Sequence, residues 1–585
     1  MTDVQGFTEE QKQYLEGFLS GIAAKRGGAM PTSLAPSTAL GTADIHRLAQ
    51  DRFVAAGKKL VAEEESKRKS HPLDDWDALL ADAAAGRFPK GTDIFRRKFF
   101  GLFYVAPAQD AFMCRLRMPN GILAAHQLAG LAALAQNFAG GYVDITTRAN
   151  LQLREIKPQN IVEILEGVQE LGLTSRGAGA DNIRNITGSP AAGIDPQELI
   201  DTRPLARQLH HYILNHRELY GLPRKFNVAF DGGGQVSVLE DTNDIGFAAV
   251  KVPAGTAVPE GVYFRMQLGG ITGHSDFARD TGILLKPEEC VAAAVAVIRV
   301  FIDAGDRTDR KRARLKYVLD AWGFEKFLAA VEKERGAPFM KLPLAACAPR
   351  APTLKHGHIG VHKQRQQGLC YVGVVLPVGR VSAEQMRGLA EIAERFGSGT
   401  IRLTVWQNMI LSDIPEAEVA AAERAIAKLG FATAASSIRG ALVACTGNTG
   451  CKFAASDTKG HAMMLAEHLE RHVTLDQPVN IHLTGCPHSC AQHFIADIGL
   501  LGVKVGDDMI EGYTIFVGGG AGQEQRLGRE IFAQVPMAEM PARIETMLRT
   551  YLAQRAAGES FHAFAARHSI EELTALIARA PEMVA

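Results

Sequence analysis

The feature that most constrains the fold of this chain is an internal duplication. Residues 117–153 (RMPNGILAAHQLAGLAALAQNFAGGYVDITTRANLQL) align without a gap with residues 375–411 (VLPVGRVSAEQMRGLAEIAERFGSGTIRLTVWQNMIL). Identical residues mark the alignment, among them Pro119 with Pro377, Gly121 with Gly379, Gln127 with Gln385, Gly130 with Gly388, Phe138 with Phe396, Thr146 with Thr404 and Asn150 with Asn408. An ungapped match of this length indicates two copies of one structural unit.

Each copy has the pattern of a strand, a turn, an amphipathic helix, a turn and a strand, which is half of a ferredoxin-like unit. A second match follows, in which DIGFAAVKV from Asp244 mirrors DIGLLGVKV from Asp497 and QLGGITG from Gln267 mirrors FVGGGAG from Phe516. The chain beyond about residue 100 is therefore predicted to be a duplicated α/β (α+β) fold. Two such halves create a pseudo-two-fold interface that can enclose a large ligand.

We expect five regions from these patterns. They are an N-terminal helical extension over 1–95, a first ferredoxin-like half-domain over 96–168, a larger mixed α/β domain over 169–350, a second ferredoxin-like half-domain over 351–432, and a second larger mixed α/β domain with C-terminal helices over 433–585. Within the extension, residues 7–24 are amphipathic and residues 29–43 have the composition of a surface linker.

Composition excludes several functional classes. Lys plus Arg and Asp plus Glu both total 64, so the chain has no net charge and is not expected to bind nucleic acid in general. Of its residues 46% are hydrophobic, without an uninterrupted apolar run near twenty, which predicts a soluble protein with no membrane span. We expect a cytoplasmic monomer.

Four of the eight cysteines form two close pairs, Cys445-x5-Cys451 and Cys486-x3-Cys490, set among small residues and turn formers. Disulfides are not expected, because no signal peptide is recognisable and the other cysteines, Cys114, Cys290, Cys347 and Cys370, are scattered singly. Zinc sites use four thiolates but usually with shorter spacing within a pair. A 4Fe-4S cluster suits wider loops, so spacing favours the cluster and leaves zinc open.

The sequence around the cysteines is more specific than their spacing. CTGNTGC, TGCPHSCAQ and ADIGLLG resemble the signature of the sirohaem-containing nitrite and sulfite reductases, in particular the single-chain ferredoxin-dependent branch. The resemblance implies that Cys445, Cys451, Cys486 and Cys490 hold a 4Fe-4S cluster. It further implies that Cys490 bridges the cluster to the sirohaem iron. By the same resemblance, residues 169–350 are expected to form a sirohaem and substrate-binding domain, and residues 433–585 a 4Fe-4S and sirohaem-binding domain.

A set of cationic and amide residues in the first copy also matches this family. They are Arg115 in FMCRLRMPNG, Arg148 and Arg154 in DITTRANLQLR on the last strand of the half-domain, Arg184 in DNIRN, and Lys225 with Asn227 in LPRKFN. Any one of them alone would more often be a solvated strand-end residue. The resemblance implies that Arg115, Arg184, Lys225 and Asn227 line the substrate side and that Arg148 serves the sirohaem carboxylates, whereas Arg154 receives no role.

Lys225 and Asn227 are two residues apart, so in an extended segment both side chains face one side while Phe226 faces the other. A further basic run, RTDRKRARLKYVLDAWG from Arg307 to Gly323, is predicted to be helical. It is either a solvated face or a source of cations for the cofactor or an acidic donor protein.

The resemblance implies an assimilatory nitrite reductase that takes nitrite to ammonium with six electrons from reduced ferredoxin. A separate donor is expected because the glycine-rich stretches lack the G-x-G-x-x-G spacing of nicotinamide or flavin sites. Lys followed by Asn at 225 and 227 is typical of the nitrite reductases, whereas the sulfite reductases typically carry Lys at both positions. The alternatives are a sulfite reductase of the same fold and a non-catalytic protein with cysteine-bound zinc or a cluster.

Overall fold

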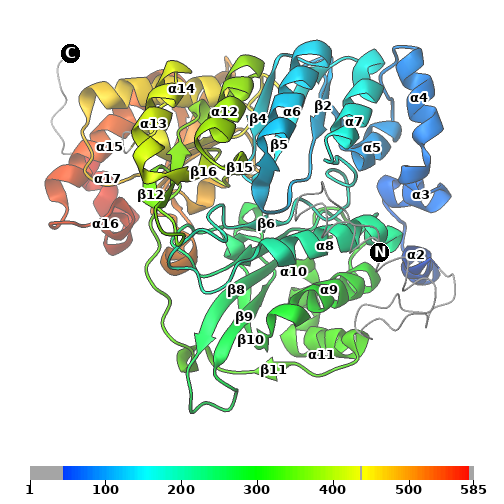
Figure 1. Cartoon of the computed structure of the whole chain (residues 1–585). Helices are drawn as coiled ribbons and strands as arrows, with labels where there is room; N and C mark the ends of the chain where they lie inside the picture. Colours follow the sequence, from blue (N-terminus) through cyan, green and yellow to red (C-terminus); the bar gives the residue numbers. More distant parts are fainter. Residues whose placement is uncertain (1–43, 435–437, 579–585) are drawn as a thin grey trace, which may run out of the picture.

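A computed structural model describes residues 44–434 and 438–578. The amphipathic segment and the linker expected within residues 7–43 lie outside this range. Figure 1 shows the two ferredoxin-like half-domains side by side, the first larger module below them, and the second with the C-terminal helices at one flank. The N-terminal helices line the opposite flank. They are α2 (Ile45–Ala55), α3 (Ala62–Lys69), α4 (Trp76–Ala84) and α5 (Asp93–Arg97).

The two half-domains have the same order of elements. The first contains β1 (Leu102–Tyr104), β2 (Phe112–Arg115), β3 (Ile122–Ala124), α6 (Ala125–Phe138), β4 (Tyr142–Ile145), β5 (Leu151–Ile156) and α7 (Ile161–Glu170). The second contains β12 (Gly360–Lys363), β13 (Leu369–Val374), β14 (Arg380–Ser382), α12 (Ala383–Phe396), β15 (Thr400–Leu403), β16 (Met409–Pro415) and α13 (Val419–Lys428). Helices α6 and α12 pack on each other, and one hydrophobic core spans both copies. The predicted duplication is confirmed.

The two half-domains exchange a strand, which the sequence pattern did not predict. The sheets have the orders β1-β2-β5-β4-β14 and β12-β13-β16-β15-β3, so each accepts one short strand from the other copy. A Cβ on Gly121, just before β3, would lie 2.7 Å from the Leu403 carbonyl oxygen of the other copy, and one on Gly379 would lie 2.8 Å from that of Ile145. Both glycines also have positive φ. Close backbone contact at the crossing explains why glycine occupies both positions.

The two larger modules share one sheet topology. The first contains β6 (Thr187–Gly188), α8 (Arg203–Asn215), β7 (Val228–Asp231), β8 (Ile245–Val252), β9 (Gly261–Leu268), β10 (Arg279–Leu285), α9 (Cys290–Ala304), α10 (Leu315–Trp322), α11 (Phe324–Arg335) and β11 (Met340–Lys341). The second contains β17 (Leu442–Ala444), α14 (Thr458–His472), β18 (Ile481–Thr484), β19 (Ile498–Val505), β20 (Ile510–Val517), β21 (Arg529–Pro536), α15 (Met540–Gln554), α16 (Phe561–Arg567) and α17 (Ile570–Ala578). In each sheet three parallel strands are followed by two antiparallel ones, and the first sheet has β11 as a further antiparallel strand at its edge.

The basic run at 307–316 differs from its prediction in two ways. The helix begins only at Leu315, so the expected helix over residues 307–314 was wrong. The run is also not a uniformly solvated face, because Arg307 and Arg314 are buried. Arg307 Nη1 donates to Glu64 Oε2 at 2.7 Å and fastens α3 to the first larger module. Arg310 and Arg314 likewise form ion pairs with distant carboxylates, those of Asp181 and Asp244.

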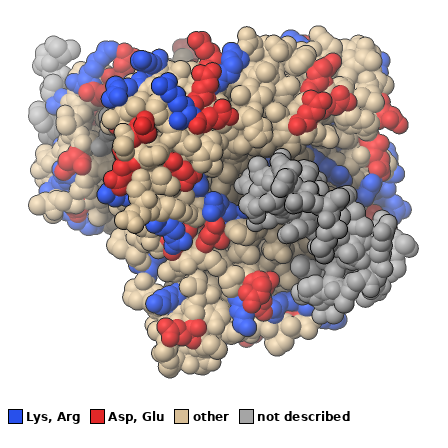
Figure 2. Space-filling view, viewed as in Figure 1, with Lys and Arg blue, Asp and Glu red and all other residues tan. Residues whose placement is uncertain are grey.

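The surface carries charges of both signs. On the face seen in Figure 2, Lys and Arg are interspersed with Asp and Glu, in keeping with equal totals of 64. Within residues 44–434 and 438–578, no helix is both long and apolar enough to cross a membrane.

Candidate active site and metal centre

The cysteine loops begin where two parallel strands end. Cys445 directly follows β17, and Cys486 comes two residues after β18, its neighbour in the sheet. The carboxyl ends of parallel strands meet at one edge, so both loops emerge together. The Gly485 amide donates to Cys445 Sγ at 3.2 Å and links the loops directly. A hydroxyl of the first half-domain completes the arrangement, since Thr147 Oγ1 donates to the Cys490 carbonyl at 2.9 Å.

Glycines let the cysteine loops pack tightly. A Cβ on Gly485 would lie 2.6 Å from the Ala454 Cβ, and one on Gly447, which has a φ of +72°, would lie 2.7 Å from the Thr458 amide nitrogen. Larger residues at these positions would push the loops apart. The small residues noted in the sequence therefore have a structural reason to be there.

The separation of the sulphur atoms distinguishes between the two metal hypotheses. Tetrahedral zinc at a Zn–S distance of about 2.3 Å requires thiolate sulphurs within about 3.8 Å of one another. In the part of the chain that the structure describes, no three cysteine Sγ atoms lie within 4.8 Å of one another. Burial raises the pKa of Cys486 to about 12, and Cys490, Cys451 and Cys445 are close enough to add to this shift. This wider spread suits a cluster with separate iron atoms better than one zinc ion.

The predicted cations gather beside the cysteines. Burial lowers the pKa of Lys225 to about 7; Arg314 adds to this shift and the Cys490 thiol opposes it. Burial also lowers the pKa of Arg115 at the end of β2, and Cys490 again opposes the shift. The Cys490 side chain is exposed, yet desolvation by surrounding protein raises its pKa. The Cys490 thiol therefore interacts electrostatically with both Lys225 and Arg115, which places these three side chains near one another.

Lys225, Phe226 and Asn227 follow the predicted alternation. Phe226 is completely buried, whereas Lys225 and Asn227 on either side of it are partly accessible. The segment lies just before β7, and the Asn227 amide donates to Asp244 Oδ2 at 2.8 Å. This anchor uses the main chain and leaves the Asn227 side chain available to the site.

Several buried polar atoms here have no hydrogen-bond partner among residues 44–434 and 438–578. They are Arg184 Nη1, Arg148 Nε and Asn227 Oδ1. Arg184 is held through Nη2, which donates to the Ala180 carbonyl at 2.7 Å, and Arg148 through Asn243 Oδ1 at 2.9 Å. Arg148 lies in the turn between β4 and β5, so its expected position on the strand was wrong. Buried guanidinium groups with free donors fit an anionic group that carries several carboxylates.

Arg154 is the residue whose role sequence reasoning missed. It lies on β5, is 1% exposed, and donates through Nη2 to the Gly450 carbonyl at 2.8 Å, directly before Cys451. Its Nε is 3.7 Å from Asp144 Oδ2. Arg154 thus joins the first half-domain to the first cysteine loop, a contact between distant segments that no local pattern signals.

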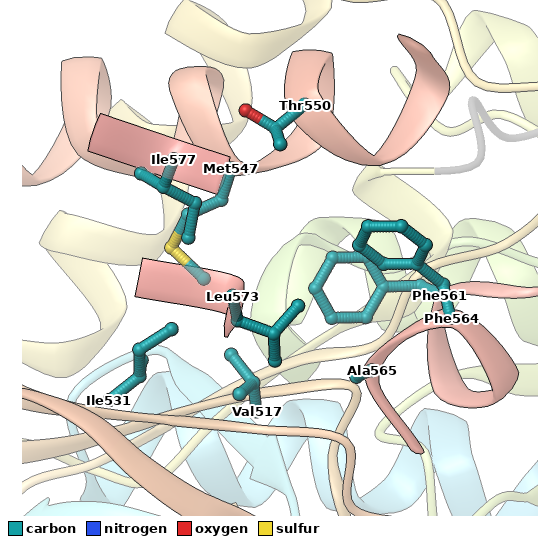
Figure 3. A pocket seen from close by; sticks show the side chains of 9 residues that line it. All are labelled: Val517, Ile531, Met547, Thr550, Phe561, Phe564, Ala565, Leu573 and Ile577. Carbon is teal, nitrogen blue, oxygen red and sulfur yellow. The ribbon is translucent and has the colours of Figure 1, made fainter. Parts of the chain in front are cut away.

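A separate apolar cavity lies among the C-terminal helices (Figure 3) and is unrelated to this site. Its volume is about 10 Å³, and Val517, Leu573 and the Phe561 and Phe564 rings are among its lining side chains. None of the predicted site residues lines it. At this size it holds at most one water molecule.

Comparison with known proteins defines the class. The family profile described as "Nitrite and sulphite reductase 4Fe-4S domain" matches residues 179–339 and 435–582. The profile described as "Nitrite/Sulfite reductase ferredoxin-like half domain" matches residues 106–171 and 362–429. The chain therefore belongs to the nitrite and sulfite reductase family of oxidoreductases, whose cofactors are sirohaem and a 4Fe-4S cluster.

Individual relatives within this family indicate more closely which of its members the chain resembles. The chain is 38% identical over 508 residues to the ferredoxin–nitrite reductase of Synechococcus elongatus, covering 84% of this chain and 97% of that protein. It is 33% identical over 477 residues to the chloroplastic ferredoxin–nitrite reductase of Zea mays, covering 78% and 81%. The structure of Mycobacterium tuberculosis NirA superposes with a TM-score of 0.81 at 29% identity, covering 89% of this chain and 98% of that one.

Proposed function

We propose that this protein is an assimilatory nitrite reductase that takes six electrons from reduced ferredoxin to convert nitrite into ammonium. The observation that carries the proposal is the proximity of Lys225 to Cys490, together with buried donors of Arg148 and Arg184 that have no partner among the described residues. The names of the similar proteins support the substrate and the donor. We also propose that the protein is a soluble, cytoplasmic monomer that binds neither nucleic acid nor membrane.

The cysteines divide into two roles in this proposal. Cys445, Cys451, Cys486 and Cys490 would hold the 4Fe-4S cluster, and Cys490 would also be a ligand of the sirohaem iron. The contact of Cys490 with the first half-domain, through Thr147, supports its position between the two copies. Sirohaem would supply the iron at which nitrogen–oxygen bonds are broken, and the cluster would supply electrons to it one at a time.

The cationic residues bind and orient the anions. Arg148, whose Nη2 donates to the Asn185 carbonyl at 2.9 Å, keeps Nε for a sirohaem carboxylate. Arg115, Arg184 and Lys225 supply the positive potential that draws nitrite to the site. Lys225 also carries protons that the nitrogen product requires, and its ammonium group is the compact donor suited to that task.

Asn227 sets the preference between substrates. Nitrite is a monoanion, whereas sulfite near neutral pH is largely a dianion, so a site for sulfite gains from one more cation at close range. The Asn227 amide donates a hydrogen bond without adding charge. Because Arg115, Arg184 and Lys225 attract either anion, the resulting preference for nitrite should be partial.

Changing Asn227 to lysine tests this assignment. The wild type should have the higher kcat/KM for nitrite, and Asn227→Lys should move the nitrite-to-sulfite ratio of kcat/KM toward sulfite by about ten- to a hundredfold. The anchor at this position is the backbone amide on Asp244, so the substitution leaves it intact. Steady-state rates with both anions and the same reduced donor measure the ratio.

Asn227→Met is the matched control, because methionine has nearly the length of lysine without its charge. It should not move the ratio toward sulfite. A wild type that prefers sulfite would favour the sulfite reductase alternative, and an unchanged ratio in Asn227→Lys would remove the specificity role of this residue.

A further inference from the structure

Three metal-binding side chains lie together at the end of α14 that is remote from the cysteine loops. His468 and His472 are four residues apart on α14, and Glu545 lies on α15, which packs against it. One ligand atom from each residue lies within 4.8 Å of those of the other two. Among residues 44–434 and 438–578, no other group of His, Cys, Asp or Glu of this size meets that spacing.

One carboxylate oxygen faces both imidazoles. His468 Nε2 lies 2.8 Å from Glu545 Oε2, and His472 Nδ1 lies 4.0 Å from the same oxygen. The two rings are 4.3 Å apart between centroids. An ion pair between His468 and Glu545 would explain the position of one imidazole only. The second imidazole, that of His472, lies near the same oxygen, so three possible metal ligands come together.

Neighbouring groups fix these ligands in place. Arg549 Nε donates to the other oxygen, Glu545 Oε1, at 2.8 Å, and Arg549 Nη2 donates to the His472 carbonyl at 2.9 Å. His472 Nδ1 also lies 2.7 Å from the His468 carbonyl, and an ion bound at Nδ1 would take the place of this hydrogen bond. A partner that orients a ligating carboxylate, as Arg549 orients Glu545, is typical of metal sites.

We propose that His468, His472 and Glu545 form a binding site for a divalent transition-metal ion of the zinc type, with water as the remaining ligand. Two imidazoles and one carboxylate are a known ligand set for zinc with three protein ligands. Magnesium and calcium prefer all-oxygen surroundings and fit this site poorly. Because His468 and His472 are four residues apart on one helix, both imidazoles lie on the same face of the helix before any ion binds.

The ion would fasten the end of α14 to α15. The opposite end of this helix begins at Thr458, whose Oγ1 donates to the Cys445 carbonyl at 2.7 Å. Because an ion that binds the folded state alone raises its stability, the site would stabilise the helix that carries the first cysteine loop. It does so without entering the proposed active site.

Zinc binding to the holoenzyme tests the proposal. Titration calorimetry with zinc chloride, on anaerobic protein with its full iron and sirohaem content, should show one zinc ion per chain and a thermal midpoint that rises with zinc concentration. His468→Ala and the milder Glu545→Gln should each weaken binding at least about tenfold, and Arg549→Met by about ten- to a hundredfold. The visible spectrum and the activity without zinc should be unchanged in all three.

The matched control is His126→Ala, which removes a single exposed histidine on α6 and should leave zinc binding unchanged. The proposal is overturned if the wild-type holoenzyme binds no zinc. It is equally overturned if His468→Ala and Glu545→Gln, folded as judged by their thermal midpoints without zinc, bind it as tightly as the wild type.

Discussion

Cys490→Ser is expected to reduce nitrite turnover to background and to eliminate the spectroscopic coupling between the cluster and the sirohaem. A serine hydroxyl stays protonated where a thiolate binds iron, so one cluster ligand and the proposed bridge are lost together. Replacing Cys445, Cys451 or Cys486 by serine should prevent cluster assembly by the same reasoning. Iron and sirohaem content, electron paramagnetic resonance spectra and steady-state rates measure these effects.

Cys347→Ala provides the control, since Cys347 is buried in a small hydrophobic cluster far from the four ligands in sequence. A lone buried cysteine behaves as a small hydrophobe, so this variant should retain iron, sirohaem and most of its activity. A Cys490→Ser protein with full iron, full sirohaem and wild-type turnover would refute the bridge.

Asp144→Asn is expected to destabilise the protein by about 3–5 kcal/mol, because it leaves buried cations without their countercharge. Asp144 is 3% exposed on β4. Its carboxylate accepts a hydrogen bond from Arg380 Nε at 3.0 Å and lies 3.8 Å from Lys459 Nζ and 3.7 Å from Arg154 Nε. These partners come from β14, α14 and β5, so one carboxylate joins both half-domain copies to the cluster domain.

The pH dependence of stability should follow from this carboxylate. Burial alone would raise the pKa of Asp144, but Lys459 and Arg380 together hold it below its usual value. The contribution of Asp144 is therefore fully present at neutral pH and is lost as the pH falls through the folded-state pKa. The variant should lack this part of the acid sensitivity.

Glu467→Gln is the matched control for charge removal. Glu467 pairs with Arg471 on the exposed face of α14, where both side chains are more than 60% exposed. Such a pair contributes about 0.5 kcal/mol. Anaerobic urea unfolding of both variants gives the comparison, and equal effects would contradict a structural role for the Asp144 network.

The repeated parts of this fold could be predicted because residues 117–153 and 375–411 align without a gap. The identity of Gly121 with Gly379 has a physical cause, since both lie where one copy's backbone crosses the other's. The exchange of β3 and β14 between sheets could not be predicted, because each short strand fits either sheet by its local pattern. The five regional boundaries and the site roles stay predictions.

The basic run shows where local patterns fail. Charge density predicted a helix whose cations either face solvent or reach the cofactor or a donor protein, yet Arg307 pairs with Glu64, 243 residues away. Contacts of that kind depend on tertiary packing and leave no mark on neighbouring residues. The same holds for Arg154, whose partner carbonyl at Gly450 lies 296 residues away. By contrast, the alternation at Lys225 and Asn227 is local, and the structure confirms it.

The proposed six-electron reduction is tested most directly by the number of electrons consumed per ammonium formed when anaerobic protein receives nitrite and reduced ferredoxin. We expect ammonium as the product, with about six reduced ferredoxins oxidised for each one, because nitrogen passes formally from plus three to minus three. No ammonium should form with NADPH as the sole donor. Robust turnover with NADPH alone, or nitrite consumed without ammonium, would contradict this proposal.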